Sequence, residues 1–447
     1  PHLEIGALYE LSLADEHPPI LVFDNIKGYP KGYRVAVNMR SSKVFDTGAT
    51  GLELVQSYRK HRRAKSEPIP PKTVTSGPVL ENKQEGAAID AFAFPAPHWH
   101  EGDGGRYIGT ECMVIVKDPD SDWVNAGCYR TQVSDKDTLV VFIEPGKHAD
   151  IIREKYWAKG QPCPMAISVG QSPALGAAAA STIAEGASEF AAAGGRLGRP
   201  IELITGKATG IPFPADSEIV FEGFMPPPEV ETRTEGPFGE WPGYYVSGTT
   251  QEPYLKVERV LYRNDPIILG APPAKPPHDH SYMRTIMKSA MIFDALVSAG
   301  IPEVKGVYAP ECGGGRMLVI VAIRQRYAGH ARQAGFIASQ CREAAYMGKY
   351  TIVVDEDIDV TNLEEVLWAV CTRTDPATSI DFIRRAWASK AEPMLRPGEP
   401  AFNSRAVIDA CKPFEWIADF PRVAEADPAY LRELEKKWAG LFDKIGR

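Results

Sequence analysis

The sequence predicts a multidomain protein of mixed α/β structure, with a β-rich middle and a C-terminal part in which helices and strands alternate. First, the chain has 447 residues, which is more than one ordinary hydrophobic core accommodates. Second, its middle contains many short apolar runs separated by glycine and proline, a pattern typical of an antiparallel barrel or sandwich. Third, helical and strand periodicities alternate in the last third of the chain.

These changes of pattern divide the chain into three expected regions. A proline-rich stretch at residues 68–78 ends the elements of the first region, and Pro276 and Pro277 open the third. The regions are an N-terminal α/β region at residues 1–90, the β-rich region at 91–275 and an α/β region at 276–447.

The first two regions have distinct expected elements. Residues 20–23 and 33–37 predict strands, and residues 51–58 predict an amphipathic helix. In the β-rich region helices are expected at 149–159 and 173–193, and the second is so rich in alanine that it suits a close approach to a neighbouring element or a cofactor. The strands expected there are residues 109–117, 123–130, 139–143, 165–169, 217–224, 244–247 and 254–262.

The third region is predicted to be α/β and to end in a separate helix. Its expected elements are a helix at 281–299, a strand at 317–323, a helix at 328–345, a strand at 350–354 and a helix at 362–369. The last helix, residues 428–445, has Asp427 as its N-cap and proline in its first position. Because this helix is amphipathic, we expect it to dock on the body of the protein or on a second subunit.

The composition places the chain among globular proteins and excludes several classes. Apolar residues make up 44% and charged residues 24%; the net charge of −8 and the lack of a basic block argue against nucleic acid as a partner. The 7 cysteines form no C-x-x-C pair, which fits reduced thiols in a cytoplasmic protein. No apolar run is long enough for a bilayer and no signal-peptide pattern opens the chain, so no membrane association is expected. Since the sequence begins without methionine, we expect some N-terminal residues to be missing.

Two carboxylates bracket a turn-forming sequence in the β-rich region. Glu235 and Glu240 flank Gly-Pro-Phe-Gly, which is too rich in turn formers to continue a helix. Such a turn can direct both acids into one pocket above Phe238, where burial separates their pKa values into one acid and one base. The alternative is a surface loop with two solvated glutamates.

Four further polar residues upstream are candidates for chemistry. Asn125 and Arg130 lie on a predicted strand, His148 near the start of a helix and Glu189 at the end of the alanine-rich helix. Each alone has an ordinary explanation, such as a surface ion pair for Arg130 or a helix cap for His148. Together the amide oxygen, imidazole nitrogen and carboxylate of Asn125, His148 and Glu189 suit Mn²⁺ or Mg²⁺ better than zinc.

Taken in order along the chain, these residues resemble the UbiD family of prenylated-FMN-dependent, reversible (de)carboxylases of aromatic and α,β-unsaturated acids. The resemblance extends from about residue 70 to the C-terminus. It is carried by Asn125-x4-Arg130, His148, Glu189, Glu235-Gly-Pro-Phe-Gly-Glu240, residues 217–223 and the Val-Asp-Glu-Asp-Ile-Asp-Val run at residues 354–360.

The resemblance implies a fold and an assembly. A central split β-barrel, similar to flavin reductases, would hold the cofactor between the N-terminal α/β region and a C-terminal α/β dimerisation domain. The protein would then be a homodimer or a higher homo-oligomer, and a flavin prenyltransferase would supply its cofactor.

The resemblance also implies a cofactor site. Asn125, His148 and Glu189 match the family's Mn²⁺ ligands, which tie the phosphate of prenylated FMN to the protein. A K⁺ ion would lie nearby, bound partly by backbone carbonyls at Ala126 and around residues 178–181. The family often has serine where this chain has alanine, so its K⁺ shell differs from the usual one.

By the same resemblance, Arg130, Glu235 and Glu240 are the catalytic residues. Arg130 would orient the substrate carboxylate bidentately, with Glu235 as its ion-pair partner. Glu240, desolvated against Phe238 and Trp241, would have a raised pKa and donate a proton to the carbon that loses CO₂. The flavin would act as the electron sink through a covalent adduct with the substrate.

Residues at the expected substrate pocket indicate a polar ligand. The resemblance places Glu144, Lys147, Trp241, His280 and Arg284 there, and polar groups in a pocket require a polar partner. We therefore expect a hydroxylated aromatic, heteroaromatic or dicarboxylated ring acid. The alternative is that His280 and Arg284 cap the following helix or bind its neighbour.

The sequence thus predicts a carboxy-lyase, a prenylated-FMN-dependent decarboxylase of an aromatic or heteroaromatic acid. One alternative is a catalytically silent accessory subunit with the same fold. Another is an Mn²⁺-dependent hydrolase, against which stands the lack of a two-metal cluster of carboxylates and histidines.

Overall fold

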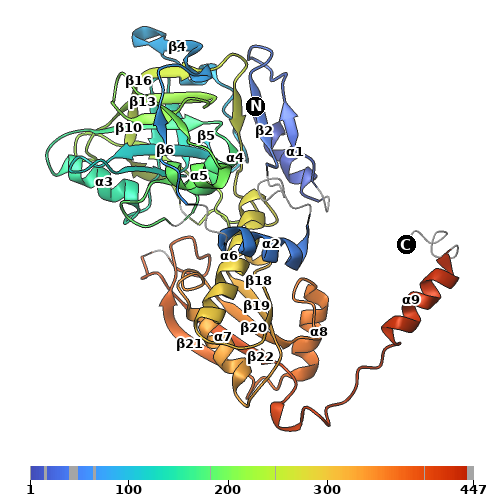
Figure 1. The fold of residues 1–447 in the computed structure, drawn as a ribbon. Coiled ribbons are helices and arrows are strands. Elements are labelled where there is room, and N and C mark those ends of the chain that lie inside the picture. The colour runs from blue at the N-terminus through green and yellow to red at the C-terminus, as the bar shows by residue number, and fades with distance from the viewer. Residues whose placement is uncertain are drawn as a thin grey trace.

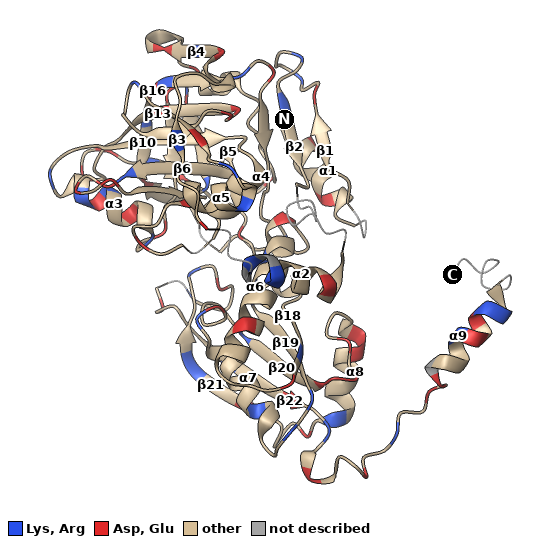
Figure 2. Ribbon diagram, in the orientation of Figure 1, with Lys and Arg blue, Asp and Glu red and all other residues tan. Residues whose placement is uncertain are grey.

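The computed structural model describes residues 2–14, 18–39, 49–63, 67–181, 183–246, 248–396 and 398–439. The fold is a mixed α+β arrangement in which a β-rich part and an α/β part are joined at the long helix α6 (Asp279–Ser298; Figure 1). Lys and Arg lie among Asp and Glu on both parts (Figure 2). No helix in these described ranges is both long enough and apolar enough to span a bilayer.

The N-terminal segment packs onto both parts. Its strands and helix were predicted correctly, although the helix continues to Arg63. An ion pair of 3.0 Å between Arg59 Nε and Asp294 Oδ1 joins α2 to α6. The elements are α1 (Glu4–Ser12), β1 (Leu21–Phe23), β2 (Arg34–Val37), which pairs with β1 and with β17 (Ile267–Leu269), and α2 (Gly51–Arg63).

A nine-stranded antiparallel sheet forms the centre of the β-rich part, in the order β5-β8-β9-β16-β13-β10-β6-β7 with β4 beside β16. Its inner strands are buried on both faces, which explains their nearly continuous apolar sequences. In β6, Val114 faces the core that includes α1 and α3 (His148–Trp157), whereas Ile115 faces the core that includes α4 and α5. The strands are β4 (Asn82–Glu85), β5 (Arg106–Gly109), β6 (Cys112–Lys117), β7 (Val124–Gly127), β8 (Thr131–Asp135), β9 (Thr138–Val141), β10 (Cys163–Val169), β13 (Ile219–Met225) and β16 (Tyr254–Tyr262).

This sheet is not a closed barrel, because its end strands β5 and β7 do not pair with each other in the described part of the chain. The split-barrel description, the domain boundaries and the dimerisation role stay predictions. Smaller sheets lie around the central one. They consist of β3 (Lys72–Thr73), β11 (Glu202–Thr205) and β12 (Pro212–Pro214), and of β14 (Arg233–Glu235) with β15 (Thr250–Glu252).

Three predictions in this part are wrong. The predicted strand at 123–130 ends at Gly127, so Arg130 lies in the connection to β8. Residues 244–247 form no strand within the described positions, where an isolated bridge joins Glu240 to Tyr244. The alanine-rich segment is two helices, α4 (Pro173–Ala179) and α5 (Glu189–Leu197), because the Ser188 side chain accepts a hydrogen bond from the Ala191 N–H and starts a new helix. Glu189 therefore begins a helix instead of ending one.

The α/β part is built on a sheet of order β18-β19-β20-β22-β21, whose three central strands are parallel. Helices α6 and α7 cover one face and α8 covers the other, so the apolar residues of β19 alternate between two cores. The last two strands were not predicted. The elements are α6 (Asp279–Ser298), β18 (Val304–Tyr308), β19 (Leu318–Ile323), α7 (His330–Gln340), β20 (Tyr350–Asp355), α8 (Leu363–Arg373), β21 (Ile380–Trp387) and β22 (Phe402–Ala410).

The terminal helix α9 (Pro428–Lys437) stands away from the rest of the chain (Figure 1). The predicted N-cap is confirmed, since the Asp427 carboxylate accepts a hydrogen bond of 2.8 Å from the Ala429 N–H. The predicted docking on the body is wrong for the described residues, most of whose side chains are exposed. Docking on a second subunit stays a prediction, and residues 440–445 of the predicted helix lie outside the described residues.

One buried arginine is expected to stabilise the α/β part strongly. Arg405 is 2% exposed and donates to the carbonyls of Ser339, Ala344, Ala345 and Trp387. Arg405→Met removes the guanidinium donor from the Ser339, Ala344 and Ala345 carbonyls, at about 1–3 kcal/mol for each that water does not reach, whereas the Trp387 carbonyl keeps the Met347 N–H. We expect the thermal unfolding midpoint to fall by several degrees. The matched change at the exposed Arg384 should shift it little, and equal shifts would contradict the assignment.

Candidate active site

An arginine and two glutamates from separate elements meet in the β-rich part. Arg130 lies between β7 and β8, Glu235 ends β14, and Glu240 lies in the turn that follows. Arg130 Nε and Nη2 donate to Glu235 Oε1 and Oε2 at 2.9 and 2.8 Å. Arg130 Nη1 donates to Glu240 Oε1 at 2.5 Å. The guanidinium thus bridges both predicted acids, and the solvated-loop alternative is wrong.

Aromatic residues surround this ion-pair group. The Tyr107 hydroxyl donates to Glu235 Oε1 at 2.8 Å, and both residues are 0% exposed. The Arg130 Cζ lies 4.1 Å from the centroid of the Phe142 ring and 5.4 Å from that of Phe238. These rings exclude water from the guanidinium, which strengthens its electrostatic interactions and fixes its orientation.

The two acids have different environments. Glu235 accepts both bonds of a bidentate pair and a third from Tyr107, whereas Glu240 accepts one bond from Arg130. Burial raises the pKa of Glu240 above its ordinary value, although the attraction of Arg130 opposes this; the negative charges of Glu235 and Glu144 raise the pKa further. Glu240 is therefore suited to carry a proton.

The loop between the two acids is held by backbone contacts. The Gly104 N–H donates to the Pro237 carbonyl at 2.7 Å, and the Gly236 N–H donates to Gln132 Oε1 at 3.3 Å. The Glu240 N–H then donates to the Tyr244 carbonyl at 3.0 Å, which closes the turn. The positions of both carboxylates thus depend on how closely this loop approaches residue 104.

Two of the three predicted metal ligands are in contact. Asn125 on β7 donates through Nδ2 to Glu189 Oε1 at 2.9 Å, and the Ala126 N–H donates to Glu189 Oε2 at 3.2 Å. Asn125 and Glu189 are each 3% exposed, and Asn125 Oδ1 is buried without a hydrogen-bond partner. Burial raises the pKa of Glu189. An unpaired buried oxygen beside a desolvated carboxylate fits a hard divalent cation.

The third predicted ligand lies near the same place. His148 begins α3, and its ring centroid is 5.0 Å from that of Trp123. Trp123 directly precedes β7 and donates from Nε1 to the Ala187 carbonyl, just before Glu189. In the described ranges no group of three His, Cys, Asp or Glu residues could hold a metal ion. The predicted set has only two residues of these types, His148 and Glu189, and its third member is Asn125. The Mn²⁺ ligand set and the K⁺ shell at Ala126 and residues 178–181 stay predictions.

Two of the predicted substrate residues, Trp241 and Arg284, are in contact, and two others, Glu144 and Lys147, lie close to each other. Trp241 is 7% exposed, and the Cζ atom of Arg284 lies 5.4 Å from its ring centroid. Glu144 accepts a 3.5 Å hydrogen bond from the Tyr346 hydroxyl, and Lys147 Nζ lies 3.7 Å from Glu144 Oε2. Side chains from the β-rich and α/β parts thus meet here.

The alternative for His280 and Arg284 is wrong in its capping half, whereas hydrogen bonds of the His280 ring to the backbone of Thr110 and Ala271 agree with its other half, binding to a neighbouring element. The N-cap of α6 is His278, whose Nδ1 accepts from the Ser281 N–H at 3.3 Å, and both residues lie inside the helix. Burial, Arg284 and His278 lower the pKa of His280 to about 3, which makes its imidazole neutral. His280 can therefore act as a hydrogen-bond donor or acceptor but carries no charge at neutral pH.

Several residues of this site were not predicted from the sequence. They lie in ordinary strands or loops, without a motif or unusual spacing that indicates a function. A glycine run before Arg316 was the one weak signal. The residues are Tyr107, Trp123, Phe142, Arg316 and Tyr346.

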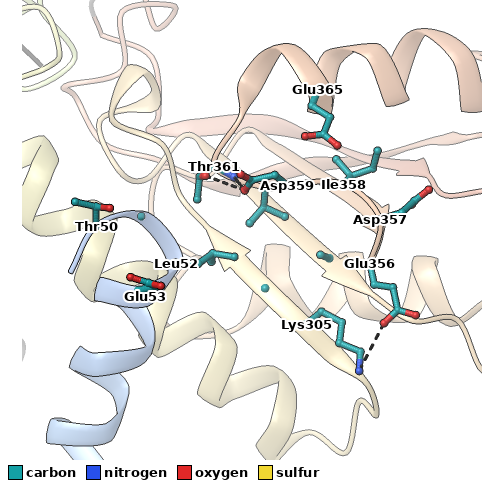
Figure 3. A pocket seen from close by; sticks show the side chains of 14 residues that line it. Thr50, Leu52, Glu53, Lys305, Glu356, Asp357, Ile358, Asp359, Thr361 and Glu365 are labelled. Carbon is teal, nitrogen blue, oxygen red and sulfur yellow. Dashed lines mark hydrogen bonds and ion pairs between the residues drawn. The ribbon is translucent and has the colours of Figure 1, made fainter. Parts of the chain in front are cut away.

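A separate pocket of about 590 Å³ lies between the start of α2 and the loop after β20 (Figure 3). Acidic residues line it, and Lys305 Nζ is 3.7 Å from Glu356 Oε2. The family-like run at residues 354–360 thus builds this pocket and not the arginine–glutamate site. The lining acids are Glu53, Glu356, Asp357, Asp359 and Glu365.

Comparison with known proteins connects this site to a class. Residues 72–276 match the 3-octaprenyl-4-hydroxybenzoate carboxy-lyase Rift-related domain, and residues 281–410 match the C-terminal domain of the same family. Pyrrole-2-carboxylic acid decarboxylase of Pseudomonas aeruginosa is 31% identical over 98% of this chain and 92% of its own length. Phenolic acid decarboxylase of a Streptomyces species is 32% identical over 96% of this chain and 90% of its own length.

Solved structures agree. The UbiD-class enzyme HmfF from Pelotomaculum thermopropionicum, in complex with FMN, has a TM-score of 0.83 and 29% identity over 96% of this chain and 92% of its own. Vanillic acid decarboxylase of Sedimentibacter hydroxybenzoicus has a TM-score of 0.83 and 27% identity over 99% of this chain and 94% of its own. These relatives are named decarboxylases or UbiD-class enzymes, which confirms the predicted enzyme class, a carboxy-lyase. The chain belongs to the UbiD family.

Gly104 is expected to control the placement of both acids. A Cβ atom there would lie 1.8 Å from the Gly236 carbonyl oxygen and 2.9 Å from the Pro237 nitrogen. Gly104→Ala must therefore displace the loop, and a misplacement of about 1 Å costs on the order of 100-fold in rate. Decarboxylation of any accepted acid should fall accordingly. Gly248→Ala, which meets no atom within 4 Å, is the control; an active Gly104→Ala enzyme would show that the contact is not required.

Proposed function

We propose that this protein is a prenylated-FMN-dependent decarboxylase of an aromatic or heteroaromatic carboxylic acid. The single observation that carries the proposal is the Arg130 guanidinium between two acids, of which one is fully buried and held bidentately and the other has a raised pKa. A decarboxylase needs both a cation for the departing carboxylate and an acid for the carbon that remains.

Arg130 binds and orients the carboxylate of the substrate. Glu235 occupies its Nε and one N–H of Nη2, and Glu240 occupies one N–H of Nη1. Each terminal nitrogen keeps a further N–H that can donate to a carboxylate oxygen. Glu235 and Tyr107 hold the guanidinium in place and do not contact the substrate.

Glu240 holds the proton that replaces CO₂. Departure of CO₂ leaves an electron pair on the ring carbon, and the Glu240 carboxyl proton moves to that carbon while its own electron pair stays on oxygen. In the reverse direction the Glu240 carboxylate removes the same proton. Trp241 and Phe238 keep bulk water away, so the proton comes from this one group.

The cofactor and metal are held by the residues that the family resemblance assigns. Asn125, His148 and Glu189 would bind Mn²⁺ or Mg²⁺, with Asn125 Oδ1 as the free ligand oxygen, and K⁺ would lie near Ala126. When bound, prenylated FMN supplies an electron sink for the carbon that loses CO₂. A flavin prenyltransferase would supply the cofactor, and we propose a cytoplasmic homodimer.

The substrate class follows from the polar residues near Trp241 and from the relatives, which are decarboxylases of pyrrole-2-carboxylic and phenolic acids. Glu144, Lys147, neutral His280 and Arg284 offer donors and acceptors to ring substituents. We therefore propose a ring acid that carries a hydroxyl, a ring N–H or a second carboxylate.

Glu240→Gln tests the role of the proton donor. The amide keeps the shape of the side chain but has no acidic proton, so CO₂ release should fall by at least about 100-fold while flavin absorbance is retained. The measurement is CO₂ release by flavin-loaded protein after co-expression with a flavin prenyltransferase. Glu231→Gln, a change at a half-exposed acid, is the control. Full activity of Glu240→Gln would refute the role.

The pH dependence has a defined sign. Because the pKa of Glu240 is raised, its protonated form persists to higher pH than that of an ordinary glutamate, and it is lost as pH rises through that pKa. Decarboxylation should therefore decline on the alkaline side. Glu240→Asp should move that decline, and an unmoved profile would assign it to another group.

A further inference from the structure

Two arginines contact the same tryptophan next to the proposed proton donor. The Cζ atoms of Arg284, in the first turns of α6, and Arg316, just before β19, each lie 5.4 Å from the centroid of the Trp241 ring. Arg316 Cζ also lies 5.3 Å from the centroid of the Tyr346 ring. The α/β part of the protein thus supplies two cations to a residue that directly follows Glu240.

Neither guanidinium has an ionic partner. Arg284 Nη1 and Arg316 Nε are buried and have no hydrogen-bond partner, and no acid within the described ranges lies within ion-pair distance of either side chain. Burial and the charge of Arg316 lower the pKa of Arg284 to about 9, and burial also lowers the pKa of Arg316. Two partly buried cations without a paired anion are costly, so the pair is suited to receive one from a ligand.

The pair belongs to the surroundings of the proposed reaction. The negative charge of Glu240 partly offsets the lowering of the Arg284 pKa, and that of Glu144 partly offsets the lowering of the Arg316 pKa. Both acids therefore lie close enough to act on the two arginines. The His278 imidazole Nε2 is 3.1 Å from the Trp241 carbonyl, which fixes the start of α6 against the turn of Glu240.

We propose that Arg284 and Arg316 form a subsite for a second carboxylate of the substrate, which makes the enzyme a decarboxylase of aromatic dicarboxylic acids. This inference rests on the proposed function, since Arg130 binds the carboxylate that leaves. A carboxylate fits better than a phenolate because two guanidinium groups present paired N–H donors to two oxygens. The second carboxylate remains bound while the first is lost as CO₂.

The test measures binding and not turnover. Flavin-loaded protein is titrated calorimetrically with matched pairs of acids: benzoate and benzene-1,4-dicarboxylate, and pyrrole-2-carboxylate and pyrrole-2,5-dicarboxylate. Each dicarboxylate should bind at least about tenfold more tightly than its monocarboxylate in at least one pair, because charge-assisted hydrogen bonds are stronger than neutral ones. In Arg284→Gln and Arg316→Gln the ratio of the two dissociation constants should approach 1.

Further variants keep the test decisive. If removal of a charge prevents folding, Arg316→Lys retains the charge without the paired donors and should reduce the ratio at least about threefold. Arg324→Gln, on the exposed side of the same part, should leave the ratio at its wild-type value. Equal affinities for both members of each pair in the wild type would overturn the proposal. So would an equal Arg316-dependent gain for 4-hydroxybenzoate, which would assign the subsite to a phenolic oxygen.

Failure of this inference is distinguishable from failure of the proposed function. Release of CO₂ from monocarboxylates, without an affinity gain from a second carboxylate, would support the proposed decarboxylase function and refute the carboxylate subsite. Conversely, tight dicarboxylate binding that depends on Arg316, without CO₂ release from any acid, would support the carboxylate subsite and refute the proposed decarboxylase function.

Discussion

The site depends on the buried bidentate ion pair between Arg130 and Glu235. Both hydrogen bonds are short, the carboxylate is 0% exposed, and the Tyr107 hydroxyl adds a third bond. Loss of one partner would leave a buried charge uncompensated, at about 3–5 kcal/mol. Because the pair links the β7–β8 connection to the end of β14, it also fixes the loop that carries Glu240. With Arg130 held in this way, we infer that its remaining donors bind the substrate.

The two parts of the molecule contribute different functions to this site. The β-rich part holds Arg130 in the connection between β7 and β8 of the central sheet and Glu235 at the end of β14 in a smaller sheet, and the ion pair joins the two. The α/β part contributes Arg284, Arg316 and Tyr346 through one helix and two loops. We infer that the first set performs the shared reaction and the second distinguishes substrates. Relatives with one fold and different acids, such as pyrrole-2-carboxylic and phenolic acids, are consistent with this division.

Local sequence predicted the elements whose pattern is strong and the acids whose spacing is unusual. Periodicity predicted strands such as Tyr254–Tyr262. The Gly-Pro-Phe-Gly turn predicted that Glu235 and Glu240 share one site, where both accept hydrogen bonds from Arg130. The alanine-rich segment was predicted as one helix because its composition outweighed the cap at Ser188. Tyr107 and Arg316 were missed for another reason. They come from distant parts of the chain, and tertiary packing alone brings them to the site. The metal ligands were indicated by family resemblance more than by any local signal.

A double-mutant cycle tests the central claim most directly. Arg130→Lys, Glu235→Gln and their combination are compared with the wild type in kcat/KM for CO₂ release. If Glu235 acts by holding the Arg130 guanidinium, the account predicts strong coupling, because the second change costs little once the pair is broken. The coupling energy should be at least about 1.5 kcal/mol. Effects that add within about 0.5 kcal/mol would show that the two residues act independently and would contradict the account.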